Sequence, residues 1–340
     1  MTKVAVVILN YNGRKFLKEF LPIVIERSGK DAEIWVADNQ STDDSVDLMK
    51  EHFPDVKLIV NDENGGFAKG YNDALSKIEA EYYVLLNSDI EVTDNWIQPV
   101  IELMDSDSNI AACQPKIRAY HDKSKFEYAG ASGGYLDKFG YPFCRGRVFQ
   151  VLEEDDGQYD NPVEVFWATG ACMFVRAETY HKLGGLDADF FAHMEEVDFC
   201  WRLKNNDYKV MVCPSSVVYH IGGGTLPKSS ARKTYLNFRN NFSLLYKNLP
   251  SDKLLKVFIL RLFLDGMAGI KFLAEGHFQD FLAVFKAHFY FYGNWGKLSK
   301  KRKKLKQKRV PHMYRGNIAL EHYLKGIKHF SDLDTERFTK

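Results

Sequence analysis

Three acidic side chains occur within four positions, in the run EEVD at residues 195–198. A carboxylate within hydrogen-bond reach of a hydroxyl can remove its proton and act as a general base. If this run opens a helix, Glu195 and Asp198 share one face and Glu196 points away from it, so we expect different tasks for them. The alternative is structural, since acids stabilise the N-terminal end of a helix and Asp198 can pair with Arg202 one turn later.

A second group of polar residues suggests a site for a nucleotide diphosphate. Asp89 ends the run NSD, which follows five apolar or aromatic residues, and there it could share a hard divalent cation with phosphates. Residues 64–72 are rich in glycine and enter a helix, whose backbone N–H groups and dipole favour an anion such as a diphosphate. Asp38 and Asn39 offer the acceptor and the amide that the edge of a nucleobase requires. The alternative is that all of these residues only cap helices and form turns.

Alternating strands and helices would bring these residues together. Apolar runs of strand length occur at residues 4–9, 34–37, 56–60 and 82–86, and segments of helix length occur at residues 14–27, 44–52 and 68–78. This alternation predicts βαβ units and a parallel, twisted sheet with helices on both faces. Ligands of such sheets lie beyond the carboxyl ends of the strands, and Tyr11, Asp38 and Asp89 fall at that edge.

The composition is that of an ordinary globular protein. The 340 residues are 45% hydrophobic and 27% charged, which argues against a disordered, collagen-like or disulfide-scaffold chain. The five cysteines are scattered without a CxxC spacing, so we expect neither a zinc cluster nor a disulfide framework, and a reducing, cytoplasmic compartment. The net charge of +1 hides an asymmetry, with −10 on residues 1–250 and +10 on residues 251–310. An acidic body with a basic extension suggests two surfaces with two tasks.

Seven motifs occur in a fixed order: VVILNYNG, ADNQSTDDS, NGGFAKGYN, LLNSD, ATGACMFV, GGLDADFFAHMEEVDFCWR and VVYHIGGG. Together they resemble the inverting family 2 glycosyltransferases of the GT-A fold, and most of all their rhamnosyltransferase-like branch. The resemblance implies an α/β nucleotide-diphospho-sugar transferase fold with a Rossmann-like, mostly parallel sheet. It covers residues 1–245 as a catalytic domain, and leaves residues 246–340 as a helical, basic and aromatic-rich C-terminal extension.

The resemblance also implies a reaction and its participants. A sugar would pass from a nucleotide-diphosphate donor of the UDP or dTDP type to an acceptor hydroxyl, with inversion at the anomeric carbon. Donor-binding residues would be Tyr11, Asp38, Asn39, Gly66, Asn72, Asn87 and Asp89. Asp89 and His220 would hold a divalent metal, Mg²⁺ or Mn²⁺, although His220 could also be a core histidine. Gly222 and the two glycines after it would permit a loop that closes over a ligand.

Two positions depart from the pattern of the family. Asn87 stands where the family often has the first Asp of its DxD motif, and an amide is a poor metal ligand, so metal binding would rest mainly on Asp89. Glu196 stands where the family has its catalytic Asp and would be the base, with one extra methylene group. The residues that would support the acceptor or the structure are Glu195, Asp198, Trp201 and Arg239. Trp201 could stack on a sugar or belong to the core, and Arg239 could neutralise the leaving diphosphate or pair with an acid.

The C-terminal extension combines aromatic and basic residues. Aromatic residues recur between positions 258 and 292, but charged residues interrupt every stretch, and no run reaches the roughly 18 to 20 apolar residues of a spanning helix. Residues 297–309 then place nine Lys or Arg in thirteen positions without an acid. Aromatic amphipathic helices followed by a polybasic stretch predict that this part of the chain lies on an anionic membrane surface through its basic segment, at the inner face of the cytoplasmic membrane. The alternatives are helices packed on the catalytic domain, or a nucleic-acid patch, against which the acidic body argues.

Two classes of function follow from these observations. The first is an inverting, metal-dependent glycosyltransferase that acts on a glycan or lipid-linked acceptor in polysaccharide or cell-envelope assembly. The second is a non-catalytic protein on the same fold that binds a nucleotide sugar or a glycan, in which Asn87 and Glu196 mark a site that no longer turns over. A nucleotidyltransferase is disfavoured because the first loop, ILNYNGRKF, lacks the basic, glycine-rich sequence that a triphosphate needs.

Overall fold

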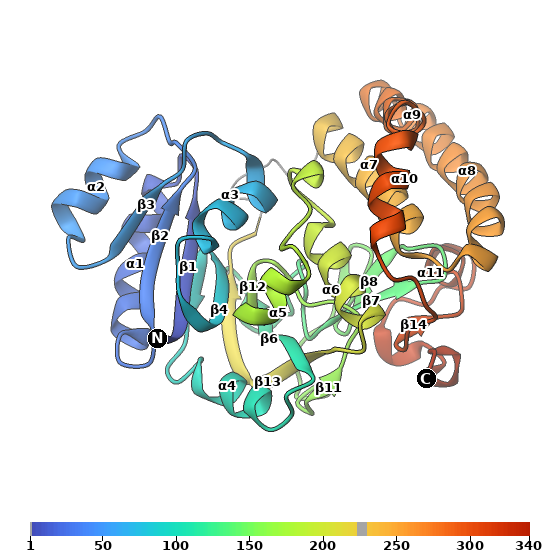
Figure 1. Ribbon diagram of the computed structural model, residues 1–340. Helices are drawn as coiled ribbons and strands as arrows, with labels where there is room; N and C mark the ends of the chain where they lie inside the picture. Colours follow the sequence, from blue (N-terminus) through green and yellow to red (C-terminus); the bar gives the residue numbers. More distant parts are fainter. Residues whose placement is uncertain (1, 223–229) are drawn as a thin grey trace.

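A mixed β-sheet is the largest element of the computed structural model (Figure 1), which describes residues 2–222 and 230–340. Its strand order is β11-β13-β6-β12-β4-β1-β2-β3, and β5 pairs with β13. The strands of this sheet are β1 (Thr2–Asn10), β2 (Glu33–Asp38), β3 (Lys57–Val60), β4 (Ala80–Asn87), β5 (Ile90–Val92), β6 (Ile110–Ala119), β11 (Val163–Glu164), β12 (Cys172–Arg176) and β13 (Lys209–His220). Gly223 and Gly224 of the expected glycine loop lie outside the described residues.

The central strand β1 shows why this sheet forms. It pairs in parallel with β2 and β4, and β2 pairs in parallel with β3. Ala5 and Val7 point into one hydrophobic core, whereas Val4, Val6 and Ile8 point into the other, so both faces must be covered. The intervening helices are α1 (Arg14–Ser28), α2 (Ser45–His52) and α3 (Gly66–Leu75). The βαβ organisation expected from the sequence is confirmed.

The other half of the sheet changes direction. β12 lies antiparallel between β4 and β6, and β13 is parallel to β6 but antiparallel to β5 and β11. The α/β fold is as expected, but the sheet is continuously parallel only from β3 to β4, and the antiparallel strand β12 separates this part from the parallel pair of β6 and β13. The strand and helix alternation that predicted a parallel sheet ends with β4. The helical elements of this half are α4 (Gln98–Asp105), α5 (Ala177–Lys182), the 3-10 turn η1 (Ala188–Phe190) and α6 (Glu195–Asn205).

A second sheet joins the middle of the chain to its C-terminal part. Its order is β10-β9-β8-β7-β14, with β7 (Gly134–Asp137), β8 (Pro142–Cys144), β9 (Arg147–Val148), β10 (Val151–Leu152) and β14 (Met313–Tyr314). β14 pairs in parallel with β7. The rings of Tyr135 and Phe143 contact Phe330 and Phe338, so the C-terminal part shares an aromatic core with the hairpins.

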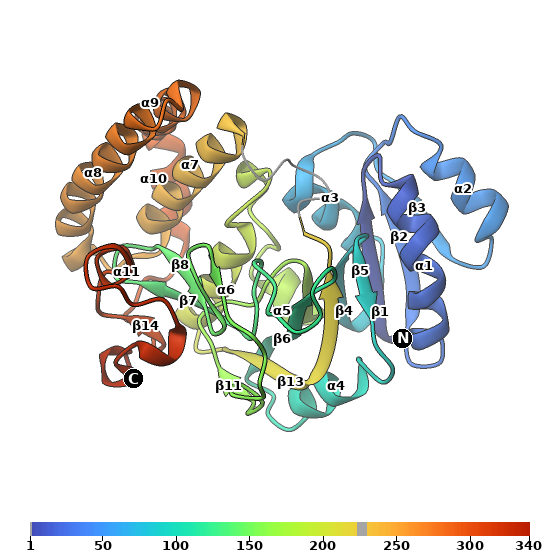
Figure 2. The ribbon, with the colours of Figure 1, turned by 180° about the vertical axis from the view of Figure 1, so that it is seen from behind.

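Helices α7 to α10 lie side by side at the end of the molecule opposite α1 and α2 (Figures 1 and 2). The helical elements of this part are α7 (Ala231–Asn248), α8 (Ser251–Ala274), α9 (Phe278–Gly293), α10 (Trp295–Lys304), α11 (Ile318–Tyr323) and the 3-10 turns η2 (Phe330–Asp332) and η3 (Thr335–Arg337). Residue 245, the expected domain boundary, lies inside α7, and the division into two domains stays a prediction. In the described part of the chain, no helix has the length and apolar character needed to cross a membrane.

Arg261 of α8 is expected to be a strong contributor to stability. Its guanidinium is 1% exposed, lies 3.0 Å from the Asp265 carboxylate, and donates a hydrogen bond to the Phe139 carbonyl in the turn between β7 and β8. Arg261→Ala would remove the guanidinium from the buried Asp265, which would keep only His288 (3.1 Å) and the Tyr141 hydroxyl (3.4 Å). We therefore expect the free energy of unfolding to fall by about 3 kcal/mol. Urea unfolding measures this. Lys256→Ala, on the exposed side of the same helix, is the control and should change stability by less than about 0.5 kcal/mol. Equal stabilities of the two variants would contradict this assignment.

Candidate functional site

The carboxyl ends of β1 and β2 are joined by a hydrogen-bond network around Asp38. This buried carboxylate accepts from the Asn10 side-chain amide (2.8 Å), the Ser41 hydroxyl (2.6 Å) and the Ser41 backbone N–H (2.7 Å). Asp38 therefore fixes the loop that follows β2 as well as standing at the expected sheet edge. Tyr11, in the neighbouring loop, is 39% exposed, so its ring is accessible to a ligand at that edge.

Asn39 connects the edge of the sheet to the start of α3. Its side-chain amide donates to the Gly66 carbonyl (3.0 Å), and its oxygen accepts from the Asn61 amide (2.8 Å). Gly66 has a φ of 77°, and a Cβ there would lie 2.5 Å from the Phe191 carbonyl oxygen. Only glycine permits this close approach. The Phe67 N–H donates to the same carbonyl (2.7 Å), so one amide that the sequence assigned to a diphosphate is bound by the protein itself.

Asn72 holds a different loop. Its side chain donates to the Leu186 carbonyl (2.7 Å) and accepts from the Leu186 N–H (3.0 Å) and the Tyr180 hydroxyl (2.7 Å). Every hydrogen-bond partner of its side chain in the described structure thus belongs to the protein. Asn72 therefore holds the loop that contains Leu186 against α3.

Asp89 and His220 lie together where β4 ends and β13 ends. The His220 Nε2 lies 3.2 Å from an Asp89 carboxylate oxygen, and its Nδ1 lies 3.2 Å from Glu127. Burial alone would lower the pKa of His220, but the two carboxylates outweigh it and raise the pKa to about 10. Burial alone would raise the pKa of Asp89, but His220 outweighs it and lowers that pKa. Asn87 lies at the edge of this group of side chains, with its amide nitrogen 3.5 Å from the His220 Nε2.

These side chains offer a donor set for a divalent cation. The two carboxylate oxygens of Asp89 are chemically suited to Mn²⁺ or Mg²⁺ if phosphate and water oxygens complete the coordination. His220 could join them only as the neutral imidazole, so a bound cation would have to displace the proton that Asp89 and Glu127 stabilise on it. Within residues 2–222 and 230–340, no group of three or more His, Cys, Asp or Glu residues forms a metal site by itself. The protein would therefore hold such a cation mainly through Asp89 together with a bound diphosphate.

The segment before α6 has a strained backbone. Phe191, His193 and Met194 have φ values of 63°, 69° and 71°, in the left-handed region that side chains with a Cβ rarely adopt. Such residues cluster at functional sites, because the surrounding structure must impose their conformation. Glu195 and Glu196 follow directly as the first residues of α6.

The two glutamates have different surroundings, as the helical spacing predicts. Glu195 is buried, and burial together with Glu196 and Asp198 raises its pKa well above the ordinary value. Glu196 is partly exposed, and burial of its carboxyl group raises its pKa to about 7. One oxygen of Glu196 is buried without a hydrogen-bond partner in the described structure. Glu196 is thus a carboxylate with raised basicity and with part of its side chain open to solvent.

Helix α7 holds the strained segment in place. The Asn240 side-chain amide donates to the carbonyls of Phe190 (3.0 Å), Ala192 (2.8 Å) and His193 (2.7 Å). The Arg239 guanidinium donates to the carbonyls of Asp189 (3.0 Å) and Phe190 (2.7 Å). Arg239 therefore binds backbone carbonyls, and its role toward a leaving diphosphate stays a prediction.

Residues of α7 and α10 extend this support to Asp187 and Asp189. Lys247 lies 2.5 Å from Asp187, and Lys301 lies 2.5 Å from Asp187 and 2.6 Å from Asp189. Lys297 adds a contact of 2.7 Å to Asp189. Part of the basic segment expected to face a membrane thus pairs with the loop that leads to the candidate base.

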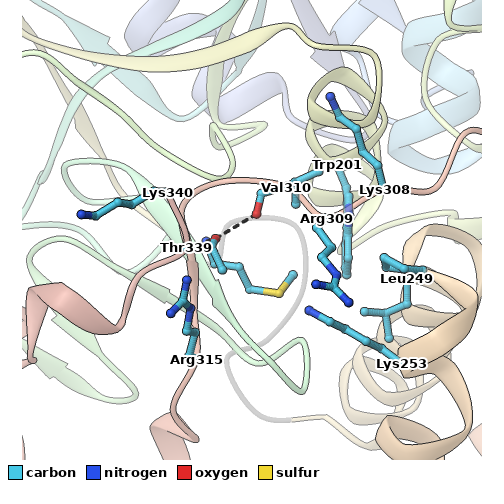
Figure 3. A pocket seen from close by; sticks show the side chains of 11 residues that line it. Trp201, Leu249, Lys253, Lys308, Arg309, Val310, Arg315, Thr339 and Lys340 are labelled. Atoms are coloured by element: carbon cyan, nitrogen blue, oxygen red, sulfur yellow. Dashed lines mark hydrogen bonds between the residues drawn. The ribbon is translucent and has the colours of Figure 1, made fainter.

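Asp198 and Trp201 have structural surroundings. Asp198 is fully buried and pairs with Arg202 (2.8 Å) and Lys247 (2.9 Å), so the structural alternative considered from the sequence is borne out. Trp201 is fully buried against Phe166, and it lines a cavity of about 290 Å³ (Figure 3). Residues of the C-terminal part, such as Arg309, also line this cavity. Trp201 thus lies at this cavity, away from the residues expected to bind the donor.

Comparison with known proteins identifies the family. Residues 5–184 match the family model described as Glycosyl transferase family 2. The chain belongs to glycosyl transferase family 2. The general rule for open α/β sheets places ligands beyond the carboxyl ends of the strands, where Asp38 and Asp89 lie, and the role of this edge in the present chain stays a prediction.

The chain is similar to two named relatives and to one solved structure of the same fold. It is 23% identical over 233 residues (63% of this chain, 75% of the relative) to the N-acetylglucosaminyl-diphospho-decaprenol L-rhamnosyltransferase of Mycobacterium tuberculosis. It is 24% identical over 245 residues (70% and 74%) to the low-salt glycan biosynthesis hexosyltransferase Agl10 of Haloferax volcanii. The solved mannosyltransferase PcManGT of Pyrobaculum calidifontis, in complex with GDP-Man and Mn²⁺, aligns with a TM-score of 0.52, 14% identity, and coverage of 88% of this chain and 85% of that one. The rhamnosyltransferase-like resemblance and the GT-A fold are confirmed.

Three residues that shape the site could not be predicted from the sequence. Glu127 is a single acid in a stretch rich in glycine and aromatic residues, and only the fold brings it to His220. Asn240 adjoins Arg239, but an isolated asparagine in a helix predicts nothing about three distant carbonyls. Phe191 contributes a backbone carbonyl, which no side-chain pattern reveals.

Asn240→Ala should loosen the strained segment. The substitution leaves the carbonyls of Ala192 and His193 without their donor, whereas the Phe190 carbonyl keeps Arg239. Each buried unsatisfied group costs about 1 to 3 kcal/mol. We expect faster amide hydrogen exchange in residues 190–196 and a lower free energy of unfolding. Asn237→Ala, on the same helix and without a side-chain hydrogen bond in the described structure, is the control. Unchanged exchange in Asn240→Ala would contradict the role of α7 as a support.

Proposed function

We propose that this protein is an inverting glycosyltransferase in which Glu196 is the general base. The observation that carries the proposal is the raised pKa of a partly exposed Glu196 carboxyl group, at the end of a strained segment that also contacts the start of α3. A carboxylate with a pKa near the working pH removes a proton most effectively, because it is both deprotonated and basic.

The proposed step transfers one proton and exchanges one bond. The Glu196 carboxylate takes the proton of an acceptor hydroxyl while that oxygen attacks the anomeric carbon of the donor. The bond between this carbon and the diphosphate breaks on the opposite side, and the nucleoside diphosphate leaves with the electron pair. Attack opposite the leaving group inverts the configuration at the anomeric carbon.

The donor is proposed to be a nucleotide sugar, of the UDP or dTDP type, bound across the carboxyl ends of β1, β2 and β4. Tyr11 would stack on the base and the loop held by Asp38 would border it, while the α3 loop would contact the phosphates. Asp89 and His220 would hold a divalent cation, which would neutralise charge on the diphosphate as it leaves. The Mn²⁺ in the PcManGT complex supports this choice of ion.

The acceptor is proposed to be a lipid-linked or cell-surface glycan. The rhamnosyltransferase of Mycobacterium tuberculosis is named for a decaprenol-linked acceptor, which supports a lipid-linked substrate for this chain as well. A cytoplasmic enzyme peripheral on the inner face of the cytoplasmic membrane would reach such an acceptor. The second candidate, a protein that binds a nucleotide sugar without turnover, would share the donor site and lack the role of Glu196.

Glu196→Gln should abolish transfer while preserving donor binding. The substitution keeps the shape of the side chain but removes the base, so we expect kcat to fall about 10²- to 10⁴-fold. Affinity for the nucleoside diphosphate, measured by calorimetric titration, should stay within about twofold because Glu196 does not contact the donor phosphates in this proposal. The proposal predicts that kcat/KM of the wild type rises with pH through about 7. Full activity of Glu196→Gln would contradict it.

The same group predicts how stability depends on pH. A glutamate of the unfolded chain loses its proton near pH 4.3, whereas folded Glu196 keeps its proton up to about pH 7. Between these values the folded state binds more protons, so the free energy of unfolding should fall as the pH rises through about 7. Glu196→Gln should show a shallower fall in urea unfolding at a series of pH values. An identical slope in both proteins would contradict the raised pKa.

Asp89→Asn should remove metal-dependent nucleotide binding. The amide is a much poorer ligand for a hard cation, so we expect the affinity for UDP, dTDP or GDP in the presence of Mn²⁺ or Mg²⁺ to fall at least about tenfold. Titration with and without the metal measures this. Asp122→Asn, at an exposed carboxylate, is the control. Metal-dependent binding that survives in Asp89→Asn would overturn the proposed metal ligand.

A further inference from the structure

The outward face of α8 and α9 exposes large apolar side chains. On α8 these include Ile259, Phe263 and Ile270, and on α9 they include Phe285, Phe289 and Tyr292, each between 48% and 71% exposed. The two helices pack against each other, with Gly269 of α8 beside the ring of Phe281 of α9, so their outward faces adjoin (Figure 2). An exposed apolar patch of this extent marks contact with another protein or with a membrane.

Helix α8 exposes apolar side chains on its outward side in addition to those that it packs on the core, such as Val257 and Phe258. Its buried side contains the ion pair of Arg261 and Asp265, which are 1% and 0% exposed. Its outward side contains Phe263 and Ile270, which are both 66% exposed. A surface helix facing water would place charges outward and apolar residues inward. This distribution instead suits an apolar environment outside the helix.

Charges on the outward face indicate what that environment is. Lys256 and Lys286 are exposed and have no ion pair with a described residue. The exposed acids of α8 and the turn after it, Asp252 and Glu275, pair with Arg309 and Lys271 respectively. A second copy of this chain would place like charges opposite one another, whereas an anionic lipid leaflet would complement them.

We propose that the α8–α9 face inserts into the headgroup and upper acyl region of an anionic membrane leaflet. The apolar side chains replace water with acyl chains, and the unpaired lysines lie among the headgroups. The sequence predicted a contact through residues 297–309 together with the aromatic helices before them, and the exposed apolar side chains assign the insertion itself to α8 and α9. Five of the nine basic residues in that segment, Lys297, Lys301, Arg302, Lys308 and Arg309, bind groups of the protein.

The inference deepens the proposed function and rests on it for the lipid-linked acceptor. Helix α7 packs on both α8 and α9, and the same helix carries Arg239 and Asn240 to the segment before Glu196. A membrane bound at α8 and α9 would therefore be one helix layer away from the support of the candidate base. An acceptor whose lipid stays in the leaflet would be presented from this end of the molecule.

Flotation with vesicles tests the inference on the full chain. Wild-type protein should float with vesicles of phosphatidylglycerol and phosphatidylcholine in equal parts, and less with phosphatidylcholine alone. The double variant Phe263→Glu/Phe289→Glu should lose at least about tenfold in binding, because two inserted rings become charged side chains. Val60→Glu adds the same charge at an exposed apolar residue of β3 and should bind as wild type does. Lys303→Gln/Lys304→Gln should have the smaller effect of two lost charges.

Nucleotide titration of the same variants separates the two proposals. The Phe263→Glu/Phe289→Glu variant should bind UDP, dTDP or GDP as wild type does, which would show that its fold is intact. Flotation of this variant at the wild-type level would overturn the inference, as would a wild-type dimer that fails to float and that the variant dissociates. Wild-type protein that floats but binds no nucleotide would leave the inference standing and overturn the proposed function.

Discussion

Hydrogen bonds from Arg239 and Asn240 to the carbonyls of residues 189–193 hold the backbone in a conformation that the segment would not keep alone. Three left-handed residues in four positions each add a conformational cost of about 1 to 3 kcal/mol, so the helical part of the chain must supply the compensation. The Phe191 carbonyl, held in this way, accepts from the N–H of Phe67, the second residue of α3, and α6 starts four residues after Phe191. We call these hydrogen bonds from Arg239 and Asn240 the α7 clamp. The clamp thus determines both how the chain enters α3 and where the Glu196 side chain points.

The clamp also explains why the C-terminal helices are part of the enzyme and more than an appendage. Lys247 of α7 and Lys301 of α10 neutralise Asp187 at the beginning of the same segment. β14 completes the hairpin sheet from the other side. A separate catalytic domain ending at residue 245 would lack the second half of this support. The membrane-facing helices and the candidate base are therefore connected by direct packing.

The sequence predicted the first half of the fold well, because β1 to β4 have strong apolar runs and helices of regular length between them. It predicted the contrast between Glu195 and Glu196 for a similar local reason, namely the 3.6-residue period of a helix. It did not predict the reversed strand β12 or the pairing of β14 with β7. These depend on long-range pairing, for which short strands of two to five residues carry little signal.

The site residues show the same contrast between contacts that local motifs predict and contacts that only the fold creates. Asp89 and His220 could be paired from their motifs, and the structure places them 3.2 Å apart. The local pattern could not show that the Asn72 and Arg239 side chains bind backbone carbonyls, because every residue has a backbone carbonyl and no residue type marks it as a partner. The same holds for the basic segment, where composition suggested a free surface and Asp187 and Asp189 proved to be its partners. The sequence correctly showed that residues 297–309 are basic, but it did not show that part of this charge pairs with Asp187 and Asp189.

The most direct test of the account is the pKa of the Glu196 carboxyl group, measured by carbon NMR on protein labelled at glutamate side chains and assigned with Glu196→Gln. The account predicts a midpoint near 7 in the wild type, and a midpoint closer to the ordinary value of about 4.3 in Asn240→Ala, where the segment is released and water reaches the carboxyl group. A wild-type midpoint near 4.3, or a midpoint that Asn240→Ala leaves unchanged, would contradict the claim that the α7 clamp creates the candidate base.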